Sequence, residues 1–394
     1  NYKLSIMKHT NTILAFILAI MIAGCEENKQ TTDDLITVDV TKTPSSKKDL
    51  ILQDFMDVEY IPLETKDDFL NQGVVQAVGK DVILVKNRND DGDIFVYDRT
   101  GKALRKINRK GQGGEEYIYI YNIILDEDKG EMYINDIYAK KIVVYDLYGN
   151  FKRNFKHKEG GGSIFYTDVF NYDKDNLICY DEYNEEIPFV LISKQDGSIV
   201  KDIKIPYKKK IMLQQQLQDG DIIYTTSPGP HRTIIPYKGN WMLSELSSDT
   251  VYTLLPDYSL RPSLVRTPPI QSMEPGIFLL LRLFSDRYIF MEAIKNVYDW
   301  NAKSGFPRTF FMYDKQEKNF FEYRVYNGDY TTQQEIYMNM LRPVNHEIES
   351  WQNLDAPRLV EAYEKGELKG KLKEIAATLD EEANPVIMLV KHKK

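Results

Sequence analysis

Cysteine is nearly absent from this sequence, since only Cys25 and Cys179 occur among its 394 residues. A framework of several disulfides is therefore excluded, and packing must hold the fold together. Cys179 lies in the apolar run 177–180, which predicts a buried strand thiol rather than a nucleophile.

Histidine is also scarce, and familiar catalytic motifs are missing. The five histidines show no His-x-x-x-His spacing, and Gly-x-Ser-x-Gly does not occur, so nothing indicates a zinc hydrolase or a nucleophile-elbow serine hydrolase. Adjacent carboxylates are more typical of solvated turns than of an acid and base pair: Glu115 with Glu116, Asp181 with Glu182, and Glu185 with Glu186. We therefore predict no catalytic residue and no metal site, and favour a non-enzymatic role.

Positive charge is in deficit. The chain has 51 basic and 59 acidic residues, which gives a formal net charge of −8. Residues 1–24 carry two lysines and no acid, so the remainder of the chain has a net charge of −10. An acidic surface repels phosphate backbones, and the composition therefore argues against a nucleic-acid partner.

Long hydrophobic runs are missing, apart from a short one near the start. Residues 13–22 are ten consecutive apolar residues, which as a helix would cover about 15 Å of a bilayer core roughly 30 Å thick. The run follows Lys8 and His9 and precedes a small-residue site, which is the order found in a signal peptide. We predict that residues 1–24 are a signal peptide and not a membrane span.

Residues 22–25 (Ile-Ala-Gly-Cys) resemble the bacterial lipobox, in which the cysteine thiol takes a diacylglycerol. The resemblance implies a lipoprotein held to the membrane through Cys25. Residues 26–34 are polar and lack an apolar period, so we expect residues 25–34 to form a tether. Because the acids after Cys25 resemble an outer-membrane export tag, the expected location is the outer membrane, facing either the periplasm or the cell surface.

What the sequence does contain is a repeated hairpin of a β-rich strand, a turn and a second strand with alternating apolar residues. It occurs five times, at residues 94–107, 142–155, 189–203, 249–262 and 310–323. Asp98, Asp146 and Ser193 hold equivalent positions and are 48 and 47 residues apart, a period that fits one four-stranded blade. The later spacings are longer, which predicts inserted loops in blades four and five.

An inner strand precedes each hairpin, for example at residues 82–85 and 131–134, and completes the meander of a propeller blade. We predict an all-β fold, a six-bladed β-propeller over residues 35–394, with a short helical insertion at 356–379 that glycine breaks into shorter helices. Since ring closure hides exposed strand edges, the C-terminal strand 386–390 should pair with either 36–40 or 58–63.

Residues 57–65, the Tyr-Asp hairpins and the glycine-rich stretch 111–117 carry a resemblance to a known group. The chain resembles lipid-anchored six-bladed β-propeller proteins of Gram-negative bacteria, whose blades are similar to NHL repeats. The resemblance covers nearly all of the chain after the signal peptide, and it implies a fold and an anchor rather than an activity.

The glycine-rich stretch looks like that group's Gly-Gln-Gly-Pro-Gly-Glu-Tyr loop, with Gly114 in place of proline and Glu115 in place of the next glycine. It lacks the Lys-Ser/Thr ending of a phosphate-binding loop. In NHL-like propellers such turns border the mouth of the central channel. The resemblance therefore makes Gln112, Glu115, Glu116 and Tyr117 candidate binding residues.

Two other segments contribute binding candidates. Residues 228–232 (Pro-Gly-Pro-His-Arg) form a constrained loop with His231 and Arg232, for which a solvated loop is the plainer interpretation. Trp300 and Arg308 flank an insertion in the fifth repeat, where exposed rings would stack on sugars or anchor a protein, although packing between blades is the alternative.

Residues 90–93 (Asp-Asp-Gly-Asp) superficially resemble a calcium loop. The bidentate glutamate that such a loop needs at its twelfth position is missing, and a blade turn needs only residues that tolerate unusual backbone angles. We predict no cofactor, with calcium as the weaker alternative.

These observations favour a lipid-anchored, non-catalytic binding or scaffold propeller of the cell envelope that serves glycan or peptide uptake, with a glycan, a peptide or an envelope protein as its partner. A propeller hydrolase or lyase with its site at the channel mouth stays open, as does a purely structural role. A bound metal, or two carboxylates about 5–9 Å apart at the mouth, would favour catalysis, whereas a groove with exposed rings would favour binding.

Overall fold

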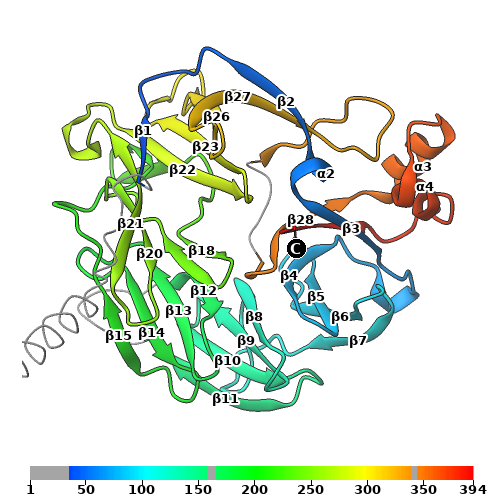
Figure 1. Ribbon diagram of the computed structural model, residues 1–394. Helices are drawn as coiled ribbons and strands as arrows, with labels where there is room; N and C mark the ends of the chain where they lie inside the picture. The colour runs from blue at the N-terminus through cyan, green and yellow to red at the C-terminus, as the bar shows by residue number, and fades with distance from the viewer. Residues whose placement is uncertain (1–34, 158–165, 339–343, 394) are drawn as a thin grey trace, which may run out of the picture. The chain divides into compact units, whose positions relative to one another are not determined.

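The computed structural model describes residues 35–157, 166–338 and 344–393. Thr37–Lys394 forms one compact unit, and its strands are arranged as a six-bladed β-propeller with few helices, as predicted (Figure 1). The predicted signal peptide, the lipobox with Cys25 and the tether lie outside the described residues. No helix in the described ranges is long and apolar enough to cross a membrane.

Blades one to three are four-stranded antiparallel meanders, each built from consecutive strands. Blade one holds β4 (Val74–Val78), β5 (Val82–Lys86), β6 (Asp93–Asp98) and β7 (Ala103–Asn108). Blade two holds β8 (Asn122–Asp126), β9 (Glu131–Asp136), β10 (Lys141–Asp146) and β11 (Phe151–Lys156). Blade three holds β12 (Tyr166–Asn171), β13 (Asn176–Asp181), β14 (Phe189–Ser193) and β15 (Ile199–Ile203).

Blades four and five each gain a fifth strand from the N-terminal part of the chain. Blade four holds β18 (Ile234–Tyr237), β19 (Asn240–Leu243), β20 (Thr250–Leu254), β21 (Leu260–Thr267) and, outermost, β1 (Ile36–Asp39). Blade five holds β22 (Ile277–Phe284), β23 (Tyr288–Lys295), β26 (Arg308–Asp314), β27 (Asn319–Tyr326) and β2 (Lys47–Ile51), which runs parallel to β27.

The expected insertions near these blades are two hairpins. The first pairs β16 (Gln215–Asp219) with β17 (Ile222–Thr226), and the second pairs β24 (Tyr298–Asp299) with β25 (Ser304–Gly305). Three single-turn helices complete the connections: α2 (Leu52–Phe55), η2 (Asp67–Phe69) and η3 (Ile270–Ser272).

Blade six closes the ring with three strands from the two ends of the chain. They are β28 (Ile348–Leu354), β29 (Val386–Lys391) and β3 (Asp57–Pro62), with β29 in the middle. Of the two segments expected to pair with the C-terminal strand, 58–63 does so, whereas 36–40 joins β21 instead. The helical insertion consists of α3 (Ala356–Glu364) and α4 (Gly370–Ala376), which lie on the outer side of this blade (Figure 1).

The hairpin motif has a direct structural explanation. Tyr97 and Tyr145 are buried in the cores between blades, and the aspartate that follows each of them accepts backbone N–H groups across its turn. The turn glycine, Gly101 or Gly149, has a positive φ of 88° or 84°, a conformation that glycine adopts at little cost. Side chains of neighbouring blades share one hydrophobic cluster, in which Leu84 of blade one packs with residues of β9 and β10. Cys179 is buried in such a cluster, as predicted.

One strand assignment needs correction. Residues 82–85 and 131–134 are strands, but each is the second strand of its blade and not the innermost one. The innermost strands of blades one and two are β4 and β8, which the sequence did not reveal. These unrecognised strands line the centre of the ring.

Candidate functional site

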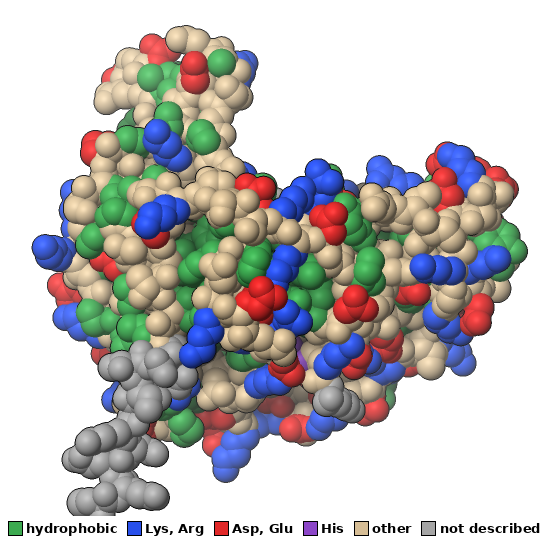
Figure 2. Space-filling model, turned by 45° about the horizontal axis from the view of Figure 1, so that its top comes forward, with side chains coloured by type: hydrophobic (Ala, Val, Ile, Leu, Met, Phe, Trp, Pro, Cys, Tyr) green, Lys and Arg blue, Asp and Glu red, His purple; other side chains and the backbone are tan. Residues whose placement is uncertain are grey.

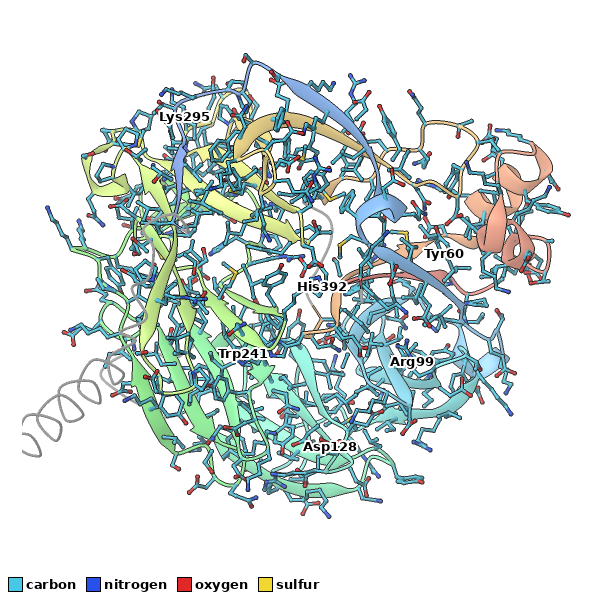
Figure 3. All side chains as sticks on the ribbon, in the orientation of Figure 1. Tyr60, Arg99, Asp128, Trp241, Lys295 and His392 are labelled. Atoms are coloured by element: carbon cyan, nitrogen blue, oxygen red, sulfur yellow. The ribbon has the colours of Figure 1, made fainter. Side chains whose placement is uncertain are left out.

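A cavity of about 1270 Å³ occupies the centre of the propeller. Most of its wall comes from β4, β8, β12 and β28, together with residues 230–232 and 344–347. Figure 3 shows Trp241, one of the lining residues, and His392 near the centre of the ring, whereas Lys295 lies towards its rim. The position of the cavity follows from the fold, because each blade presents its innermost strand to the central axis.

Aromatic side chains form one part of the wall. Trp241 is stacked against Tyr172 with ring centroids 5.7 Å apart, and the ring of His346 meets Trp241 edge-on at 4.5 Å. Tyr121, on the connection into blade two, also lines the cavity and is 38% exposed. Rings of this kind offer apolar faces to sugars or to peptide side chains.

The charge of the wall differs from that of the whole chain. Seven basic side chains line the cavity against four acidic ones: Lys80, Lys86, Arg88, Arg99, Arg232, Arg282 and Lys391 against Asp126, Glu127, Asp128 and Glu347. The chain as a whole is acidic, with a formal net charge of −8. Figure 2 shows Lys and Arg interspersed with Asp and Glu over the face that it presents.

Arg232 joins two blades beside the cavity. The Arg232 guanidinium donates from Nη1 to Glu349 Oε1, and the same oxygen accepts the backbone N–H of Phe284 at 3.0 Å. Arg232 and Glu349 are 6% and 1% exposed, and burial raises the pKa of the Glu349 carboxyl, although the guanidinium opposes this shift. The pair ties the loop before β18 to β28.

A second ion-pair group lies behind Arg282. Arg282 donates from Nε and Nη2 to Glu292 Oε2 at 2.8 and 2.6 Å. Arg308 donates from Nη1 to Glu292 Oε1 at 2.6 Å. Arg308 also donates to the carbonyl of Pro228 at 2.6 Å. The three side chains therefore fix residues 228–232 against blade five.

His231 lies on the cavity wall between these groups. Burial lowers its pKa to about 4, with Arg282 and Lys210 adding to the shift and Glu245 opposing it. Burial likewise lowers the pKa of His392 to about 4. Both imidazoles are therefore neutral at pH 7.

Acidic side chains gather where blades three and four meet. Asp168 of β12 accepts a hydrogen bond from Thr233 Oγ1, and Glu245 accepts from Lys210 Nζ at 2.8 Å. Burial raises the pKa of Asp168, and it also raises that of Glu182, to which Asp168 and Glu245 contribute. The sequence drew attention to Glu182 only as the neighbour of Asp181, and both were expected to be solvated turn residues. This expectation is wrong for Asp181, which is buried.

The glycine-rich loop that was expected at the channel mouth does not line the cavity. Tyr117 is fully buried and donates to the carbonyl of Gly92 at 2.6 Å. Glu116 accepts the N–H of Gly113 at 2.8 Å, while Gln112 and Glu115 are exposed. The loop connects β7 to β8 and is held by hydrogen bonds to Gly92, Tyr145 and Asn154 of blades one and two.

The remaining candidates divide between the cavity and the insertion. His231 and Arg232 line the cavity, and Arg308 reaches it indirectly through Glu292 and Arg282. Trp300 is not part of the wall, and its ring meets Tyr298 edge-on at 4.9 Å. Arg282 and Trp241, which no motif singled out, belong to the wall.

The acidic turn considered for calcium has other partners. Asp90 pairs with Lys110 at 2.8 Å, Asp93 pairs with Lys106 at 2.7 Å, and Asp91 accepts from Asn87 at 2.6 Å. Within the described residues, no three His, Cys, Asp or Glu side chains are grouped so that they could hold a metal ion.

These features define a class of protein, a six-bladed propeller with a polar and aromatic central cavity. The chain belongs to the family described as Domain of unknown function (DUF4934), which it matches over residues 35–391. No curated protein matches the chain.

Solved structures support the fold. A protein from Bacteroides fragilis, named as an exported protein, is 16% identical with a TM-score of 0.56, and the match covers 92% of this chain and 99% of that one. A DUF4221 member from Bacteroides vulgatus is 9% identical with a TM-score of 0.44, over 86% and 97% of the two chains. Virginiamycin B lyase from Staphylococcus aureus is 9% identical with a TM-score of 0.35, over 85% and 99%. The first likeness shows a shared fold, and the two lower scores support no inference about activity.

Proposed function

We propose that this protein is a lipid-anchored, non-catalytic binding propeller of the cell envelope, and that its ligand occupies the central cavity. The observation that carries this proposal is the 1270 Å³ cavity, lined by the inner strands of several blades. This volume exceeds the roughly 300–1,000 Å³ of typical small-molecule pockets, so it suits an oligomer better than a single small metabolite.

The wall chemistry favours a short glycan or peptide. Tyr121 supplies a partly exposed ring, with the edge of Trp241 beside the cavity, while Gln76 and Gln352 supply partly exposed amides that can donate and accept hydrogen bonds. Sugar hydroxyls and peptide groups both need such paired donors and acceptors. A role in glycan or peptide uptake at the envelope fits this combination.

Ligand-induced stabilisation tests binding directly. The chain from residue 35 onward is screened by thermal shift against panels of oligosaccharides, short peptides and divalent ions, because a ligand selective for the native state raises the melting temperature. We expect at least one oligosaccharide or peptide to raise it by several degrees. If none does, the cavity is not a binding site for these classes.

The anchor is a separate part of the proposal, supported by the lipobox-like residues 22–25 and by the exported relative of the same fold. Two acyl chains hold a protein firmly where one does not, and both depend on the Cys25 thiol. We expect wild type in the outer-membrane fraction and Cys25→Ser in the soluble fraction, with unchanged melting temperatures. A Cys25→Ser protein that stays in the membrane pellet would contradict lipid anchoring.

A propeller hydrolase or lyase is the second candidate, favoured by the carboxyls of Asp168 and Glu182, whose pKa values are both raised. Carboxyls whose pKa is raised by burial are groups of the kind that general acid–base chemistry uses. Each ligand that stabilises the protein is incubated with it and examined by mass spectrometry. Product formed by wild type but not by Asp168→Asn or Glu182→Gln would favour the enzyme, and recovery of intact ligand would favour binding.

A further inference from the structure

Three arginines beside the cavity, where blades four, five and six meet, outnumber the carboxylates that pair with them. Three guanidinium groups meet two carboxylates there: Arg232, Arg282 and Arg308 against Glu292 and Glu349. Arg282 and Arg308 both pair with Glu292, and Arg232 pairs with Glu349. One positive charge is therefore left without a carboxylate.

Neighbouring groups add little charge of either sign. Burial raises the pKa values of the Asp168 and Glu182 carboxyls and so disfavours their charged forms. His231 and His392 are uncharged at pH 7, since each has a pKa of about 4. Lys210 and Glu245 neutralise each other in a pair of 2.8 Å. The Arg308 side chain is 28% exposed and is screened by water, whereas Arg232 and Arg282 are 6% and 5% exposed and line the cavity.

The unpaired hydrogen-bonding capacity lies at the same place. Arg232 lines the cavity, and its Nη2 has no acceptor among the described residues. Nε2 of His231, the preceding residue on the wall, also has no partner there. A buried polar group without a partner is costly, so a ligand that brings an acceptor to the Arg232 guanidinium would offset part of this cost.

We propose that the cavity recognises its ligand through a carboxylate group, which docks against the guanidinium groups of Arg232 and Arg282. This inference rests on the proposed binding function and names the chemical class of its ligand. A planar carboxylate matches the fork of donors on an arginine, and charge-assisted hydrogen bonds of this kind are about twice as strong as neutral ones. The carboxylate can come from an acidic sugar or from the C-terminus of a peptide.

The test compares carboxylates with uncharged analogues of the same shape at constant ionic strength. The probes are acetate against acetamide, galacturonate oligomers against neutral galactose oligomers, and trialanine against trialanine amide. We expect acetate to bind about tenfold more tightly than acetamide. We expect the same preference for the acid in at least one of the two larger pairs. The larger pair that responds identifies the source of the carboxylate.

The variant Arg232→Gln/Glu349→Gln removes both charges of one ion pair, so the net charge beside the cavity is unchanged while the guanidinium donors of Arg232 are lost. Its matched control is Arg358→Gln, which removes an arginine with an 85% exposed side chain on α3. We expect the double variant to lose the preference for acids while the control keeps it, and the melting temperature without ligand reports whether each variant folds. Should the double variant unfold, Arg232→Lys, which keeps the charge but not the fork, replaces it and should weaken the preference.

Two results would overturn the inference in different ways. If neutral analogues bind as tightly as acids, or if the double variant keeps the preference, carboxylate recognition is wrong while ligand binding in the cavity stands. If no probe and no member of the wider panels binds, the proposed function fails and the inference fails with it.

Discussion

Arg232, in the loop before β18, donates a hydrogen bond to Glu349 of β28 and thereby connects blade four to blade six beside the cavity. Because Glu349 is 1% exposed, Arg232→Met would leave its carboxylate buried without a cation. We expect the free energy of unfolding, measured in urea, to fall by about 3–5 kcal/mol.

The control for this prediction separates loss of the pair from loss of an arginine. Arg358→Gln, on the exposed side of α3, should change the unfolding free energy by less than about 0.5 kcal/mol. Equal effects of Arg232→Met and Arg358→Gln would show that the Arg232–Glu349 contact does not hold the blades together.

Ring closure depends on β29, the middle strand of blade six. Residues Val386 to Val390 are fully buried, and deleting residues 384–394 would leave β3 and β28 with unpaired edges. We expect the whole propeller to lose several kcal/mol, a large part of the stability of an ordinary domain. Circular dichroism melting of this truncation is compared with deletion of residues 393–394 alone. Melting within a few degrees of the full chain would refute closure by this strand.

Two turn glycines with positive φ test how tightly blade one docks against blade six. A Cβ on Gly101 would approach the carbonyl oxygen of Pro62 more closely than van der Waals contact allows, whereas one on Gly130 would meet nothing within 4 Å. Gly130→Ala should cost about 1–2 kcal/mol from its backbone angle alone, and Gly101→Ala roughly 1–3 kcal/mol more. Urea unfolding measures both, and equal losses would show that the two blades are not in close contact at Pro62.

Local patterns in the sequence predicted the outer parts of the blades well. The hairpins around Tyr97 and Tyr145 alternate apolar and polar residues, end in aspartate and turn at glycine, so each signal is complete within about a dozen residues. The break between α3 and α4 was likewise visible from Gly366 and Gly370.

The site was harder to predict because its residues come from elements without a local signature. The innermost strands β4 and β8 are only five residues each, and neither shows a regular alternation of apolar and polar side chains. Glu349 and Arg232 are 117 residues apart, and no local pattern pairs them. The loop 228–232 was singled out for its prolines and glycine, but its partners Arg282 and Glu292 carried no signal.

The central claim, that ligand binds inside the ring, is tested most directly by filling the cavity. Gln76 of β4 is a partly exposed lining residue, and Gln218 of β16 is exposed outside the cavity, so Gln76→Trp and Gln218→Trp are a matched pair. Thermal shifts with the same oligosaccharide and peptide panels are measured for both variants and for wild type. We predict that compounds which stabilise wild type stabilise Gln218→Trp by as many degrees and leave Gln76→Trp unchanged. Equal stabilisation of Gln76→Trp would contradict binding in the central cavity.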